Sequence, residues 1–99
     1  KFVNGVIYED ITTSDRKELN VEGVFINVGQ IPNTNFLKNF LMLNEFNEVV
    51  ADGKTGETSI SGIFAAGDAT DIPFKQCIIA AGQGAVSALS AHKYLQSLD

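Results

Sequence analysis

Residues 58–69 read TSISGIFAAGDA, and this stretch carries the most information about the fold. A polar turn leads into the apolar run of residues 63–66, which stops at Gly67, and Asp68 then supplies a carboxylate. A continuous apolar run is typical of a strand buried on both faces of a parallel sheet. Open α/β sheets bind ligands beyond the carboxyl ends of their strands. The pattern therefore predicts an α/β fold in which Asp68 stands beside a ligand and Gly67 lets the backbone approach it.

The composition is that of a globular protein, with 44% hydrophobic and 19% charged residues in a chain of 99. The net charge of −5 and the absence of a basic cluster argue against nucleic acid or an anionic membrane as partner. No apolar run approaches the roughly 20 residues of a membrane span. A single cysteine excludes an internal disulfide and favours a reducing, cytoplasmic compartment. The chain opens at Lys1 in what resembles mid-strand sequence, so we interpret it as a piece of a longer protein.

Two segments near the N-terminus have the composition of strands. Residues 2–9 and 21–28 are rich in β-branched and aromatic side chains, and together they predict a β-hairpin with a turn at residues 14–17. Pro32 then ends the sheet, because it has no amide hydrogen. We expect a short helix over residues 35–40, capped by a preceding polar side chain, and short strands before the opening motif.

A long helix is predicted over residues 75–98, where only Gly82 and Gly84 interrupt good helix formers. Each glycine costs a helix about 1 kcal/mol relative to alanine, so two of them suggest close approach to a sheet or a cofactor. The larger apolar side chains of this helix are expected to form its packing face: Ile78, Ile79, Val86, Leu89 and Leu95.

Two local features are candidate binding sites. Asp68 could accept hydrogen bonds from ligand hydroxyls, such as those of a ribose or ribitol, or could be an ordinary turn or cap aspartate. Lys75, Gln76 and Cys77 stand at the start of the long helix, where free N–H groups and the helix dipole attract negative charge. Lys75 opposes that dipole, which marks either a functional position or a solvated lysine. Cys77 alone is most often a small buried residue.

Several other chemistries find no support in the sequence. Residues 82–87 suggest a Gly-rich dinucleotide loop, but no strand precedes them and Ser87 replaces the last glycine. His92 is the only histidine, so no Ser-His-Asp arrangement can be argued. No metal-ligand cluster and no catalytic residue are predicted.

Three motifs occur in a fixed order: GQIPNT at 29–34, TSISGIFAAGDAT at 58–70 and PFKQCIIAAGQGAVSALSAHKYL at 73–95. This order resembles the C-terminal part of the low-molecular-weight thioredoxin reductase family. It equally resembles the flavoprotein subunit of bacterial alkyl hydroperoxide reductase. The resemblance covers essentially the whole chain. It implies part of a Rossmann-like α/β fold with two dinucleotide-binding domains, one for FAD and one for NADPH or NADH.

By this resemblance, residues 1–28 would be the last hairpin of the NAD(P)H-binding domain and residues 29–99 the C-terminal half of the FAD-binding domain. The FAD ribitol would bind Asp68, with Gly67 giving it room. The pyrimidine edge of the flavin would lie against the helix start, which consists of Lys75, Gln76 and Cys77. The parent enzyme would pass electrons from NAD(P)H through FAD to a disulfide, would act on thioredoxin or a peroxiredoxin-type protein, and would be a homodimer.

The chain also departs from the family. The Gly-rich loop for FAD phosphates, the NAD(P)H fingerprint and the redox Cys-x-x-Cys are all missing from these 99 residues. We therefore expect one wall of a flavin site and no disulfide reduction by this chain alone. The alternative interpretation is a non-catalytic module that self-associates or completes a split flavoprotein, because a strand without its neighbours recruits partners.

Overall fold

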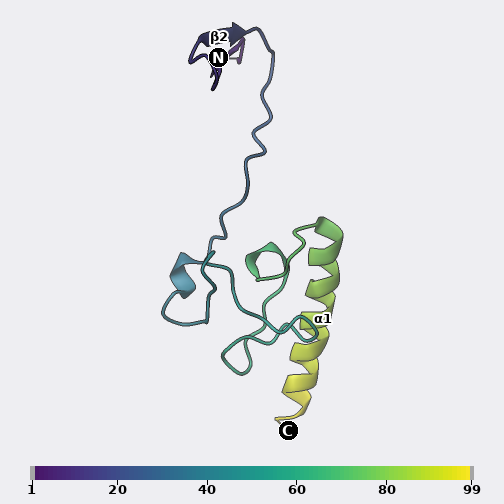
Figure 1. The fold of residues 1–99 in the computed structure, drawn as a ribbon. Coiled ribbons are helices and arrows are strands. Elements are labelled where there is room, and N and C mark those ends of the chain that lie inside the picture. The colour runs from purple at the N-terminus through teal and green to yellow at the C-terminus, as the bar shows by residue number, and fades with distance from the viewer. Residues whose placement is uncertain (1, 99) are drawn as a thin grey trace. The chain divides into compact units, whose positions relative to one another are not determined.

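The computed structural model describes residues 2–98. The chain divides after Gln30 into two compact units (Figure 1). The division lies two residues from the domain boundary predicted between residues 28 and 29. The assignment of the two parts to NAD(P)H-binding and FAD-binding domains stays a prediction. No helix within residues 2–98 is both long and apolar enough to cross a membrane.

The first unit contains a small antiparallel hairpin of β1 (Val6–Glu9) and β2 (Arg16–Leu19). Its turn forms because one carboxylate oxygen of Asp10 accepts the backbone N–H groups of Thr12 and Thr13, at 3.0 and 3.4 Å. Ser14 completes the reversal with a φ of 59°. A β-hairpin whose first strand lies within residues 2–9 is present, as predicted, but its turn lies earlier than residues 14–17 and its second strand is not the predicted one.

The predicted second strand over residues 21–28 is wrong. No backbone group from residue 22 to residue 30 forms a hydrogen bond within the described chain, and Phe25 and Val28 are fully or almost fully exposed. The Asp10 turn instead places Arg16 directly opposite Glu9, with their side chains 3.5 Å apart. A tight local turn therefore selects a polar strand as partner, although residues 21–28 have the stronger strand composition.

The second unit consists of loops packed against α1 (Cys77–Gln96), which runs along one side of it (Figure 1). The long helix predicted over 75–98 is thus confirmed with slightly shorter bounds. The short helix predicted over 35–40 is only the 3-10 turn η1 (Asn35–Leu37). Thr34 precedes η1 but does not cap it, because its hydroxyl donates to the carbonyl of Asn47.

The apolar run of residues 63–66 does not form the continuous buried strand that its composition predicts. Its side chains are half-buried, and pairing is limited to hydrogen bonds of Ile63 and Ala65 with residues 56–58 and to one bridge, Glu57 to Phe64. A central strand needs neighbours on both edges. Within residues 31–98 the run has one short neighbour, residues 56–58, and its other edge has no strand beside it.

The packing face predicted for α1 is largely wrong. Ser87 is the buried residue of α1, and its hydroxyl donates to the carbonyl of Ala65 at 3.0 Å. Ile78 and Leu89 are 81% and 70% exposed. Apart from chain neighbours and the backbone of α1 itself, no described atom lies within 4 Å of a Cβ placed on Gly82 or Gly84, so they make no close approach to a sheet within the described residues. Their predicted approach to a cofactor stays a prediction. The helix packs on the loops through a mixed side, on which Ser87 and Gln83 form hydrogen bonds and the Tyr94 ring lies edge-on to Phe64 with centroids 6.1 Å apart.

Candidate functional site

The turn that carries Asp68 is built around Gly67. Gly67 begins the 3-10 turn η2 (Gly67–Ala69) with a φ of 79°, a conformation that favours glycine. Its N–H donates to Oε1 of Gln83 on α1 at 2.9 Å, and a Cβ at this position would lie 3.4 Å from Cβ of Ala80. Gly67 therefore turns the backbone here, while its predicted role of giving a ligand room stays a prediction. The next residue, Asp68, is exposed, and its carboxylate forms no hydrogen bond within residues 2–98.

The start of α1 is open to a ligand. Gln76 is the N-cap residue in an extended conformation, and no side chain caps the helix. The first turn holds no acidic residue, and Gln76 and Cys77 are exposed. Cys77 is therefore not the small buried residue that a lone cysteine most often is. The uncapped N–H groups and the positive end of the helix dipole suit a negatively charged or electron-rich group.

These two features belong to one region of the molecule. The turn η2 packs against α1, and Gly67 lies beside Ala80, three residues after the helix start. The region therefore presents one free carboxylate and one free helix terminus. A ligand with hydroxyl groups and an electron-rich ring matches this pair of features, because the carboxylate accepts hydrogen bonds and the terminus donates them. The residues present thus fit a flavin and its ribitol chain.

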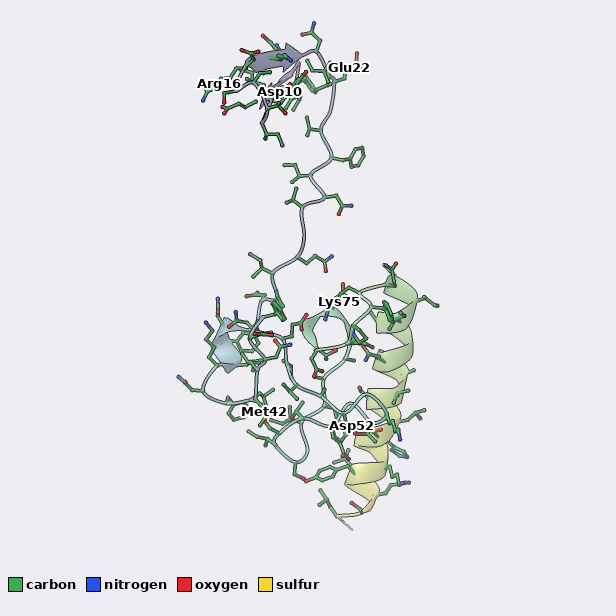
Figure 2. The ribbon with its side chains drawn as sticks, viewed as in Figure 1. Asp10, Arg16, Glu22, Met42, Asp52 and Lys75 are labelled. Atoms are coloured by element: carbon green, nitrogen blue, oxygen red, sulfur yellow. The ribbon has the colours of Figure 1, made fainter. Side chains whose placement is uncertain are left out.

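Lys75 lies just ahead of α1 (Figure 2), and its side chain is not free in solvent. Its ammonium group is 2.8 Å from Oε1 of Glu48 and also donates to the carbonyl of Thr70. The alternative interpretation of Lys75 as a solvated lysine is therefore wrong. The sequence does not single out Glu48, because its partner lies 27 residues away and no local pattern connects them.

The carboxyl of Glu48 is held in its charged form. The Lys75 ammonium, and then the Asn44 amide at 2.6 Å from Oε2, keep its pKa below the ordinary value of 4.5. A carboxyl with a lowered folded-state pKa contributes stability that is present above its unfolded pKa and is lost as the pH falls through its folded pKa.

We therefore expect the free energy of unfolding to fall as the pH is lowered below 4.5, and to fall less steeply in Glu48→Gln. Asp10 and Asp52 also have lowered pKa values, through hydrogen bonds from backbone N–H groups, and act in the same direction. Urea unfolding of both proteins at a series of pH values separates the contribution of Glu48. Parallel curves for the wild type and the variant would contradict this assignment.

A separate cavity of about 440 Å³ opens between α1 and the loops around residues 51–56 and 70–73. Its walls are mainly apolar and include Ile72, Ile79 and Val86. None of the predicted flavin-contacting residues lines it. The candidate site is the Asp68 turn and the helix start, because a carboxylate and the first helix N–H groups have no side-chain partner there within residues 2–98.

Residues 3–88 match the family model described as pyridine nucleotide-disulphide oxidoreductase. The chain is 44% identical over 93 residues to a subunit of the alkyl hydroperoxide reductase of Xanthomonas campestris pv. phaseoli. It is 46% identical over 93 residues to the corresponding subunit of the Staphylococcus aureus enzyme. These alignments cover 94% of this chain but only 17% and 18% of the relatives. The chain thus spans less than a fifth of the length of these proteins.

The structure is similar to that of thioredoxin reductase from T. acidophilum, with a TM-score of 0.75 and 42% identity. The likeness covers 97% of this chain and 31% of that one. The predicted fold class, a partial α/β fold of the flavoproteins with two dinucleotide-binding domains, is confirmed. The family match covers most of the chain, so the chain belongs to the pyridine nucleotide-disulphide oxidoreductases.

Proposed function

We propose that the chain is the C-terminal, flavin-contacting segment of an enzyme that passes electrons from NADPH or NADH through FAD to a protein disulfide. The observation that carries the proposal is the pairing of the free Asp68 carboxylate with the uncapped start of α1 in one region. Family membership supports flavin and pyridine nucleotide as the cofactors. The protein substrate would be thioredoxin or a peroxiredoxin-type protein, and the parent enzyme a cytoplasmic homodimer.

The residues proposed to hold FAD would contact different parts of the cofactor. Asp68 would accept hydrogen bonds from ribitol hydroxyls, and Gly67 would keep the backbone clear of them. Gln76 and Cys77 would offer the first N–H groups of α1 to the pyrimidine edge, with the charge of Lys75 close by. The bound flavin supplies the hydride and electron chemistry. The chain itself contributes binding and orientation, because its one cysteine cannot form a Cys-x-x-Cys pair.

We expect Asp68→Ala, in the flavoprotein that carries this segment, to weaken FAD binding by about 2 kcal/mol, or roughly thirtyfold in Kd. The reason is the loss of hydrogen bonds to a charged acceptor. Titration of apoprotein with FAD, followed by flavin fluorescence, gives the Kd. Asp71→Ala is the matched control, because Asp71 is also exposed and its carboxylate only accepts the N–H of Ala51 at 3.3 Å. Equal affinities of Asp68→Ala and wild type would refute the proposed role.

A second candidate function is a non-catalytic module that self-associates or completes a split flavoprotein. The specific observation in its favour is the exposure of large apolar side chains on α1, at Ile78, Leu89 and Leu95. Such a surface marks a site of contact with other protein.

A further inference from the structure

One ion pair connects two segments that are far apart in the sequence. Glu48 precedes the buried residue Val49, and Lys75 lies two residues before α1 begins. Their charged groups are 2.8 Å apart, and the two side chains are only 17% and 27% exposed. Partial burial reduces screening by water and salt, so this pair is stronger than one on the open surface.

The carboxylate end of the pair is fixed in place by its own loop. Oε2 of Glu48 accepts the Asn44 amide at 2.6 Å, while Oδ1 of Asn44 accepts the N–H groups of Phe46 and Glu48 at 3.0 and 2.9 Å. Both oxygens of Glu48 therefore have partners, and only one is used for Lys75. A carboxylate whose other oxygen is fixed by a hydrogen bond can set the position of the ammonium group that it binds.

The ammonium end reaches the turn that carries Asp68. Lys75 donates to the carbonyl of Thr70, which is 2% exposed. The Thr70 hydroxyl and N–H both donate to the carbonyl of Gly67, at 2.8 and 3.0 Å. A continuous chain of polar contacts thus runs from Glu48 through Lys75 and Thr70 to the first residue of η2. The same Lys75 is joined through Gln76 to the start of α1.

We propose that Glu48 and Lys75 are positioning residues that hold the Asp68 turn and the first turn of α1 at a fixed separation. The inference rests on the proposed flavin site and names what keeps its two sides in place. Lys75 acts through Glu48 and Thr70, since its ammonium group is already bound by both. Correct spacing of contact groups determines affinity, because a ligand that touches both sides loses contacts when one side moves.

The test is a double-mutant cycle in the flavoprotein that carries this segment. We expect Glu48→Gln and Lys75→Met each to raise the Kd for FAD about tenfold, and the double variant to raise it by a similar factor, because both remove one shared interaction. Lys75→Arg should retain nearly wild-type affinity, since it keeps the charge and the donors. Visible circular dichroism of the bound flavin should change in both single variants and stay unchanged in Lys75→Arg.

Other outcomes separate the two proposals. An unchanged Kd in both single variants, or a double variant whose loss is the product of two independent losses, would overturn the positioning role. A lowered denaturant midpoint with unchanged Kd and flavin circular dichroism would show a structural role only, and would overturn it as well. If Glu48→Gln does not fold, Glu48→Asp shortens the reach to Lys75 and should give an intermediate Kd. Failure of the wild-type protein to bind FAD would refute the proposed function itself.

Discussion

Gly56→Ala is expected to lower the free energy of unfolding by about 4 kcal/mol, the sum of overpacking and backbone strain. Gly56 is buried with a φ of 74° at the point where the loop meets α1. A Cβ there would lie 1.9 Å from Oγ of Ser87 and 2.9 Å from the carbonyl oxygen of Ala65. The Ser87 hydroxyl donates a hydrogen bond to this carbonyl, so neither group can move without breaking the contact between helix and loop.

The same turn offers a matched control. Gly53 has open space where its Cβ would be, so Gly53→Ala should keep the stability near that of the wild type. Urea unfolding of the 99-residue chain, followed by circular dichroism of α1, measures both variants. Adding Ser87→Gly to Gly56→Ala should recover part of the loss, because it removes the nearest clashing atom and leaves the strained φ. An unchanged midpoint in Gly56→Ala would contradict the packing described here.

Features set by neighbouring residues could be predicted from the sequence. Gly67 stands between an apolar run and a carboxylate, and its turn follows from that local order. The bounds of α1 follow equally from a stretch without strong breakers. Amino-acid composition predicts residues 21–28 as the second strand of the hairpin, and this prediction is wrong. The hydrogen bonds of Asp10 form a tight turn that brings residues 16–19 beside the first strand instead.

Features set by distant partners could not be predicted. Nothing around Glu48 indicates that its carboxylate meets Lys75, since the contact requires the whole intervening loop to fold first. The orientation of α1 escapes prediction for a related reason. Large apolar side chains normally face the core, but here Ser87 does, and Ile78 and Leu89 lie outside. The spacing of apolar residues predicts which face of a helix will be buried, but it does not predict which segment of protein will cover that face.

The exposed face of α1 leads to the second large effect. Ile78 and Leu89 are separated by about three helical turns and lie on the same side, so both can be buried by one partner. Each fully buried side chain of this size contributes about 1.5–3 kcal/mol. We expect the isolated chain to self-associate through this face. The double substitution Ile78→Gln and Leu89→Gln should weaken association by about 3 kcal/mol or more, a factor above roughly a hundred in Kd.

Sedimentation velocity across a wide concentration range measures this association. Ile11→Gln is the control, because Ile11 is 98% exposed at the hairpin turn, away from α1 in the sequence, and its loss should leave the association unchanged. Glutamine retains good helix propensity, so the double variant should keep its helical circular dichroism. A wild-type chain that sediments as a monomer at every concentration would contradict the prediction.

The same double variant also distinguishes the two functions proposed for the chain. If the chain belongs to a larger flavin domain, the remainder of that domain covers Ile78 and Leu89, and the two glutamines should then destabilise the whole flavoprotein by several kcal/mol. If the chain works as a separate module, the substitutions should abolish its assembly and leave its own fold intact. The effect of the double variant on stability and on assembly therefore distinguishes two partners for the exposed face of α1, a second copy of the chain or the rest of one enzyme. The flavin motif alone does not distinguish them.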